Sequence, residues 1–329
     1  DPAGVIEHID QDVPMLIEQI RTRVLPKRGI VAAPDEILIT LGSQNALYLL
    51  TRLLLSSTTR IGVENPCFRE AINTFLLADA EVVPHPVDEE GIVLNERPCD
   101  YYYVTPGHQV PTGVTMSSAR RRQLLEHAAR HDAVIIEDDY DSESNFTLNP
   151  LPALKASDRS GRVVYVSSLS KALSPGLRLG FMVADPDLID EARALRRLVY
   201  RHPPTNIQYQ MAHFLAQGHY ETHLRRYHYD SAQRWERLHA ALQRYLPSCR
   251  ALAGSEHANA FWLQTPAQIN TQQLTWRAAH AGVLIEPGAR HFLSAAPPDN
   301  YFRIGFHAIN PDAIAQGVEV LRGQLEQMG

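Results

Sequence analysis

VYVSSLSKALSPGLRLGF, residues 164–181, joins two apolar runs through a short polar connection that contains one lysine, Lys171. Continuously apolar runs are typical of strands that are covered on both faces. The connection SKALSPG leaves no room for a crossover helix, so we expect one of the two strands to run antiparallel to the rest of its sheet. A lysine at the end of a buried strand also requires a functional explanation, because burial disfavours the charged form of its amine.

On either side of this segment, short β-type runs alternate with helical stretches. Strands are expected at 37–40, 60–64, 80–84, 101–105, 133–138, 162–168 and 179–184, and helices at 44–55, 69–78 and 118–131. Each of these helices follows a Ser, Asn-Pro or Ser-Ser start signal. The pattern predicts an α/β fold, with a mostly parallel, mixed seven-stranded sheet flanked by helices.

The C-terminal third of the chain has a different pattern. Apolar residues at three- and four-residue spacing predict one long amphipathic helix over 222–246. Three candidate strands, ANAFWLQ, GVLIEPG and NYFRIGFHA, surround a helix at 271–281, and a last helix ends the chain. We therefore expect a large domain over residues 1–215 and a smaller α+β domain over 216–329.

Composition excludes several classes of function. With 31 basic and 37 acidic residues among 329, the net charge of −6 offers no general attraction for nucleic acid. The sequence has neither an 18-residue apolar run nor a basic-then-apolar leader, so we expect a cytoplasmic protein without membrane contact. Its three cysteines form no C-x-x-C pair, and His219 and His223 lack the glutamate of a zinc motif, so no metal site is expected.

The residues around Lys171 suit a carbonyl cofactor that carries a phosphate. Its amine could form a Schiff base, and burial with nearby cations would favour the neutral form. Ser168, Ser170 and Arg178 lie three before, one before and seven after it, and hydroxyls with an arginine fork bind phosphate well. Upstream, a strand passes through Gly42 into a helix whose free N–H groups could bind the same anion.

The run AVIIEDDYDSE supplies a carboxylate for such a cofactor. Asp138 continues directly from the apolar strand, and a carboxylate at that depth needs a cationic partner. A protonated pyridine nitrogen would be one. Acidic clusters at strand ends are more often solvated, and we expect this for Asp141 and Glu143.

Together these segments resemble the fold-type I enzymes that use pyridoxal 5'-phosphate (PLP), which have the fold of aspartate aminotransferase. More narrowly they resemble the MocR/GabR-type branch of the GntR family, bacterial transcription regulators in which an aminotransferase-like domain follows a winged-helix DNA-binding domain. The resemblance spans the chain and rests on LITLGSQNAL, ENPCF, VTPGHQVPTG, IIEDDYDSE, SSLSKALSPGLRLGF and YFRIGFHA, in that order. HQVPTG and EDDYDSE are closer to the regulators, because transaminases typically carry N-P-T-G.

The resemblance implies a role for each matching residue. Lys171 would be the internal-aldimine lysine, Asp138 the partner of the ring nitrogen and Tyr140 that of the ring hydroxyl. Phe68 would stack on the ring, and Arg303 would bind the carboxylate of the ligand, with Arg69 as a further candidate. The phosphate would be held by Ser43, Gln44, Ser168, Ser170 and Arg178.

The sequence departs from the family pattern in two places. Either His108, Gln109 or neither could replace the Asn of N-P-T-G. The tyrosine that the family supplies across its homodimer has no match near the N-terminus, so it either precedes this chain or is replaced by His8.

Two functions remain open. The first is the effector-sensing domain of a regulator, which binds an amino compound as an external aldimine and reaches DNA only through an N-terminal winged-helix domain absent from this chain. The abrupt start and the two branch motifs favour it. Effectors of the branch range from γ-aminobutyrate, taurine and D-alanine to ectoine-derived diamino acids and PLP itself, and Arg303 predicts an anionic group on the effector. The second is a free-standing PLP-dependent aminotransferase; a PLP-dependent lyase or decarboxylase would use the same site.

Overall fold

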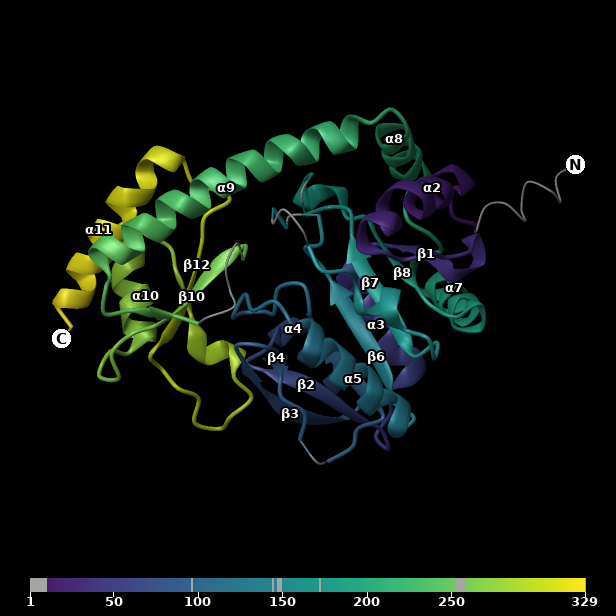
Figure 1. Ribbon diagram of the computed structural model, residues 1–329, viewed down its shortest axis with the longest axis horizontal. Helices are drawn as coiled ribbons and strands as arrows, with labels where there is room; N and C mark the ends of the chain where they lie inside the picture. Colours follow the sequence, from purple (N-terminus) through teal and green to yellow (C-terminus); the bar gives the residue numbers. More distant parts are fainter. Residues whose placement is uncertain are drawn as a thin grey trace, which may run out of the picture.

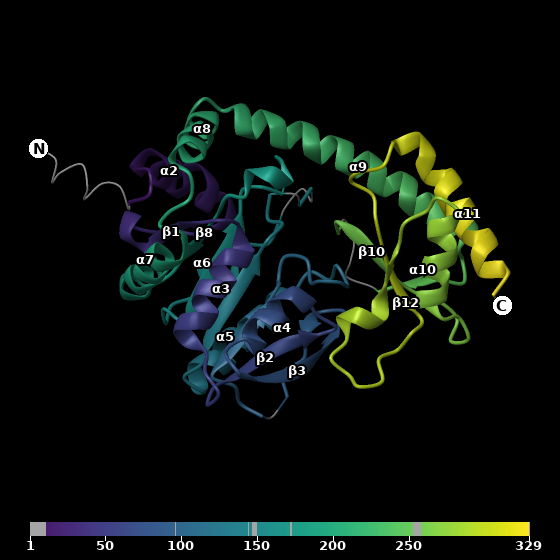
Figure 2. The same cartoon turned by 180° about the vertical axis from the view of Figure 1, so that it is seen from behind.

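The computed structural model describes residues 11–95, 97–143, 145–146, 150–171, 173–252 and 258–328. These residues form one eight-stranded sheet and one four-stranded sheet. The long helix α9 (His219–Tyr245) runs along one edge of the molecule between them, as the opposite views in Figure 1 and Figure 2 show. None of the helices in the described ranges is long and apolar enough to cross a membrane.

The large sheet contains the seven predicted strands. Its strand order is β1-β8-β7-β6-β5-β2-β3-β4. The strands are β1 (Ile37–Thr40), β2 (Arg60–Asn65), β3 (Glu81–Asp88), β4 (Gly91–Ile92), β5 (Tyr101–Val104), β6 (Val134–Asp139), β7 (Val163–Ser168) and β8 (Gly180–Val183). The short β4, which pairs antiparallel with the end of β3, adds an eighth strand that the sequence did not predict.

The direction of the strands follows from their connections. The pairs from β3 through β2, β5 and β6 to β7 are all parallel. Apart from the short β4, only β8 runs against its neighbours, β7 and β1, so the antiparallel pairing predicted from SKALSPG is confirmed. Parallel strands end at the same edge of a sheet, which brings the residues after β5, β6 and β7 together.

Helices cover both faces of this sheet, as its apolar strands require. On β6, Ile136 packs in a core with α3 (Ser43–Leu54), α4 (Arg69–Leu76) and α7 (Pro186–Tyr200). The neighbouring Ile135 points to the other face, against α5 (Ser118–Arg130) and α6 (Leu154–Ser157). Nearer β1, α2 (Pro14–Gln19) and α8 (Thr205–Ala216) pack with residues of β1, β7 and β8.

The small sheet is antiparallel throughout, in the order β11-β12-β10-β9. Its strands are β9 (Arg250–Ala251), β10 (Ala260–Gln264), β11 (Glu286–Pro287) and β12 (Tyr301–Gly305). The predicted strand GVLIEPG is thus reduced to two residues. Helices α10 (Thr271–His280) and α11 (Ile314–Glu326) share an apolar core with this sheet and with the C-terminal half of α9.

Six shorter helical segments complete the described chain. One is a π-helical turn, Ile20–Val24. The others are 3₁₀ segments at Leu25–Arg28, Pro34–Glu36, Pro175–Leu177, Gly288–His291 and Pro311–Ala313.

Candidate functional site

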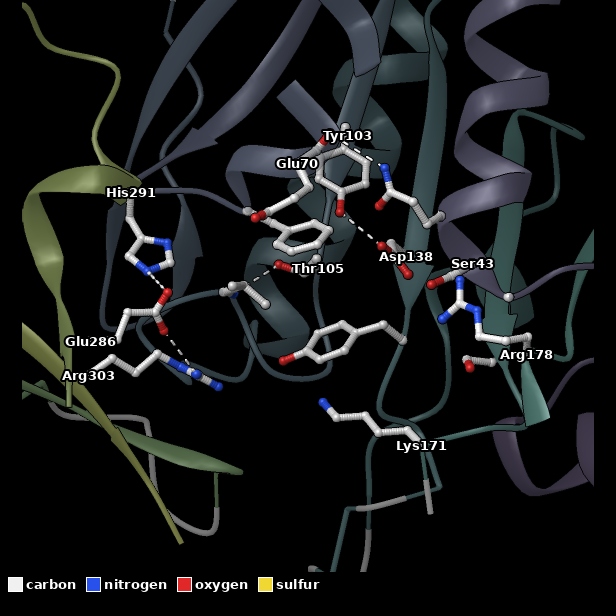
Figure 3. Close-up of a pocket in the computed structure, with 16 residues that line it drawn as sticks. Ser43, Glu70, Tyr103, Thr105, Asp138, Lys171, Arg178, Glu286, His291 and Arg303 are labelled. Atoms are coloured by element: carbon white, nitrogen blue, oxygen red, sulfur yellow. Dashed lines mark hydrogen bonds and ion pairs between the residues drawn. The ribbon is translucent and has the colours of Figure 1, made fainter. Parts of the chain in front are cut away.

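A pocket of about 380 Å³ lies where the large sheet's strand ends face the small sheet (Figure 3). Nine of the eleven predicted site residues line it, namely Ser43, Gln44, Phe68, Asp138, Tyr140, Ser168, Lys171, Arg178 and Arg303. They come from the starts of two helices, the ends of two parallel strands, the β7–β8 connection and β12. The pocket therefore brings together segments from almost the whole length of the chain.

Lys171 projects into this pocket from the connection after β7. Its Nζ lies 4.0 Å from the centre of the Tyr140 ring. The side chain is accessible to solvent through the pocket, yet desolvation by the surrounding protein lowers the pKa of the amine to about 8, while Asp141 and Asp138 act in the opposite direction. A lysine with this pKa is partly neutral near pH 7 and can act as a nucleophile.

Asp138 lies near the end of β6 and has one unsatisfied oxygen. Its Oδ2 accepts a hydrogen bond of 2.9 Å from the Tyr103 hydroxyl. Its Oδ1 is buried and has no hydrogen-bond partner among the described residues. Desolvation raises the pKa of this carboxyl to about 7. A cationic N–H in the pocket would satisfy Oδ1 and favour the ionised carboxylate.

The opposite end of the pocket can hold an anion. Helix α3 begins after Gly42, without a side-chain cap, so its first N–H groups are free to bind a ligand. Arg178 also reaches this end, where its Nη2 donates to the Leu41 carbonyl at 3.3 Å. A Cβ on Gly42 would lie 3.3 Å from that Nη2, and its φ of +79° is unfavourable for other residues. Glycine thus permits the close approach of Arg178 to the helix.

These features fit PLP in three independent respects. The pocket has a partly neutral lysine for an aldehyde, an unsatisfied carboxylate oxygen for a ring N–H, and a helix N-terminus with an arginine for a phosphate. Phe68 provides an apolar wall among the lining residues. Nine of the eleven residues that the sequence resemblance implied therefore lie in one cavity.

Arg303 lies on the side of the pocket that the small sheet forms. The sequence did not indicate which residues surround it there. Its Nη1 is 3.3 Å from Oε2 of Glu286, which is its cross-strand partner on β11. Oε1 of Glu286 lies 3.4 Å from Nε2 of His291, and both residues line the pocket, as Figure 3 shows. Glu70 and Tyr103 also line it. The continuous apolar run VLI before Glu286 gave no sign that this carboxylate faces a ligand site.

Two predicted residues do not line the pocket. The Ser170 hydroxyl donates to the Leu179 carbonyl at 3.0 Å and accepts from the Leu179 N–H at 2.8 Å. Its position is structural, because it closes the connection between β7 and β8. Arg69 lines a separate hollow with residues 289–290 and 292–295.

Neither residue that could replace the Asn of N-P-T-G lines the pocket. The Gln109 amide donates to the carbonyls of Pro66 and Val110, both at 2.7 Å. The buried His108 ring points instead toward Asp141, with Nδ1 2.8 Å from Oδ2. Val110 takes their place among the lining residues.

Asp141 and Glu143 are buried, so the expectation of solvated side chains was wrong. The first of them is part of a hydrogen-bonded chain that crosses to the small sheet. Asn259 Nδ2 donates to Asp141 Oδ2, and Asn259 Oδ1 lies 3.0 Å from Nε2 of His307. Nδ1 of His307 is 3.1 Å from the Tyr227 hydroxyl on α9. Burial lowers the pKa of His307 to about 4, so a neutral ring donates through Nε2 and accepts at Nδ1.

Two further expectations concern the substitute for the cross-dimer tyrosine and a metal site. His8, the suggested substitute for the cross-dimer tyrosine, lies outside the described residues. Within the described part of the chain, no group of three or more His, Cys, Asp or Glu side chains is arranged to hold a metal ion.

Comparison with protein families identifies one that matches nearly the whole chain. The family described as "Aminotransferase class I and II" matches residues 9–321. Among solved structures, the α-aminoadipate aminotransferase LysN from Thermus thermophilus, complexed with N-(5'-phosphopyridoxyl)-L-leucine, superimposes with a TM-score of 0.85. It is 28% identical, over 94% of this chain and 81% of LysN.

Curated relatives include transcription regulators. The HTH-type transcriptional regulator TauR of Rhodobacter capsulatus is 39% identical over 94% of this chain and 64% of its own length. The probable rhizopine catabolism regulatory protein MocR of Rhizobium meliloti is 34% identical over 94% of this chain and 63% of its own length. The chain thus spans a little under two thirds of these two regulators.

Proposed function

We propose that this chain, which belongs to the class I and II aminotransferase family, is the effector-sensing part of a transcription regulator. Pyridoxal phosphate is the cofactor of this family. The observation that carries the proposal is the meeting of Lys171, the unsatisfied Asp138 oxygen and the α3 N-terminus in one pocket. The similarity to TauR and MocR supports a regulator.

Each residue then has a distinct task. When bound, PLP supplies an aldehyde that reacts with amines and a ring that withdraws electrons. Lys171 would hold the aldehyde through its amine, and the free oxygen of Asp138 would accept a hydrogen bond from the ring nitrogen. Arg178 and the first N–H groups of α3 bind the phosphate, and Arg303 binds an anionic group of the effector. Tyr140, beside Lys171, is the candidate for the ring hydroxyl.

A sensor and an enzyme use Lys171 differently. In a sensor, Lys171 would only have to hold the cofactor and give up its place to the effector amine. In an aminotransferase, the released amine must also move a proton at the ligand's Cα. The second candidate function is therefore a PLP-dependent aminotransferase, and the pKa of about 8 for Lys171 favours it, because an amine near this pKa can both accept and donate the proton.

The remaining parts of the proposal concern the assembly. We propose that the chain acts as a cytoplasmic homodimer and meets DNA only through a winged-helix domain outside these residues. Effector binding would alter the arrangement of the two sheets and pass that change to the attached domain.

Removing the lysine tests the attachment site. Lys171→Ala should abolish the visible absorption of lysine-bound PLP, while circular dichroism shows an intact fold. Lys27→Ala, which removes a lysine paired with Glu221 on the surface, is the matched control and should keep the absorption. Visible absorption retained in Lys171→Ala would refute the attachment site.

Adding candidate amines with an oxo-acid then separates the two functions. A spectral shift without amino-group transfer supports the sensor. Sustained transfer to the oxo-acid supports the aminotransferase.

A further inference from the structure

Arg303, the arginine proposed to bind the anionic group of the effector, lies beside a carboxylate in the pocket. Arg303 and Glu286 are directly opposite each other on β12 and β11, and their side chains form an ion pair of 3.3 Å. Both side chains are about 30% exposed and both line the pocket (29% for Arg303 and 30% for Glu286), so a ligand can reach either of them. The far end of the pocket therefore presents a positive and a negative group side by side.

This ion pair leaves both partners able to bind a ligand. It uses only one guanidinium nitrogen, Nη1, at a distance longer than that of a good charge-assisted hydrogen bond. Among the described residues no partner contacts the Nε and Nη2 donors of Arg303, which can therefore bind a carboxylate. Glu286 is held from its other side by Arg290 and His291, each 3.4 Å from Oε1. These contacts hold the pKa of Glu286 at about 2, so it is ionised at every working pH.

The surrounding charges disfavour a second anion on the ligand. Glu70 lines the same pocket and lies 3.5 Å from Arg290, so two carboxylates share the far end with Arg303. A ligand with one anionic group can bind Arg303 without bringing a second negative charge close to Glu286 or Glu70. A further anionic group would lie near Glu286 or Glu70, and like charges at close range are destabilising.

We propose that Glu286 is a specificity-determining residue, and that the Arg303–Glu286 pair selects an amino compound whose far end carries one anionic group next to a cationic or hydrogen-bond-donating group. Such an end is a zwitterion, with the anion on Arg303 and the ammonium on Glu286. The proposal rests on the proposed function, since it names the ligand class of that same pocket.

Four amines with one carbon skeleton test this selectivity. They are 4-aminobutyrate and its C2-substituted forms 2,4-diaminobutyrate, 4-amino-2-hydroxybutyrate and 2-(2-aminoethyl)malonate, which add an ammonium, a hydroxyl and a carboxylate beside the first carboxylate. Dissociation constants come from spectral titration of the PLP-loaded chain and from calorimetry. We expect the diamino compound to bind about tenfold more tightly than 4-aminobutyrate, as one added charge-assisted hydrogen bond would give. The malonate should bind most weakly.

The variant Glu286→Gln keeps the shape of the side chain and removes its charge. It should abolish the tenfold preference for the diamino compound and improve binding of the malonate. Glu319→Gln, which removes a surface charge paired with Arg322 on α11, is the matched control and should leave all four constants unchanged. The same order of affinities in wild type and Glu286→Gln would overturn the proposal.

A failure of the proposed function has a different signature. If the chain gains no Lys171-dependent absorption with PLP, the function itself is wrong. If the absorption is present and shifts with the amines, but Glu286→Gln does not change their ranking, only the specificity proposal fails.

Discussion

The lowered pKa of Lys171 has a measurable chemical consequence. Desolvation brings it from an ordinary 10.5 to about 8. At pH 7 an amine with a pKa of 8 is about 9% neutral, against about 0.03% for an ordinary lysine, a difference of roughly 300-fold in reactive amine. Lys171 should therefore be modified by an amine-directed reagent at neutral pH, with a reaction rate that levels off above pH 9.

Competitive labelling with trace acetic anhydride between pH 6 and pH 10, read by mass spectrometry, measures this directly. The chain has only three lysines, Lys27, Lys155 and Lys171, so each labelled peptide is unambiguous. Two variants should move the midpoint in opposite directions. Asp141→Asn removes a charge that raises the pKa of Lys171, so its midpoint should fall; Arg303→Gln removes one that lowers it, so its midpoint should rise.

The opposite shifts are the critical part of this test. A rate that continues to rise to pH 10 would show that the pocket does not desolvate the amine. Shifts in the same direction for both variants would show that the charges of Asp141 and Arg303 do not act on Lys171.

Two further predictions concern the carboxylate and the anion end of the pocket. The pKa of Asp138 is about 7 in the folded chain and about 4 when unfolded, so the folded cofactor-free chain binds more protons and loses stability as pH rises between these values. Asp138→Asn should reduce this loss by up to about 1 kcal/mol per pH unit in urea unfolding at pH 5 and pH 8; an unchanged slope contradicts the burial argument. Gly42→Ala should lower the free energy of unfolding by about 1 kcal/mol and weaken PLP binding, because its Cβ would crowd Arg178. Gly161→Ala also places a side chain at a positive φ, +69°, but meets no neighbour within 4 Å, so equal PLP affinity in the two variants would exclude a role for the Arg178 contact.

The sequence predicted those parts of the fold that depend on local pattern. The seven main strands were found because their apolar runs are interrupted by recognisable turn and helix-start signals. The length of SKALSPG alone predicted that one of the two strands it joins is antiparallel to the rest, and the structure shows that this strand is β8. The burial of Asp138 could be predicted because this residue directly continues the apolar run of β6.

The parts that were missed depend on contacts between distant segments. Ser170 resembles a phosphate ligand in sequence, but its hydroxyl is used by Leu179 across the β7–β8 connection. Asp141 was predicted to be solvated because its own segment contains no partner for it. Its buried partners, His108 and Asn259, come from other loops. Glu286 faces the pocket because β11 pairs with β12 in one particular register, and register is set by the packed sheet rather than by the strand's own residues.

Helix α9 is a single uninterrupted helix of 27 residues, which makes it about 40 Å long and stiff on that scale. Tyr227 lies in the part nearer its N-terminus and is hydrogen-bonded to His307, at the end of the chain that starts from Asp141 beside the pocket. If α9 tilts by only about 5° where it packs on the four-stranded sheet, its far end moves by about 3.5 Å, by the geometry of a beam of this length. That far end packs against α8, which in turn contacts α2, as Figure 1 shows. The same tilt moves Tyr227, about 27 Å from the opposite end of α9, by about 2.4 Å, so a shift at the Tyr227–His307 contact reaches the α8 end of the helix enlarged about 1.5-fold.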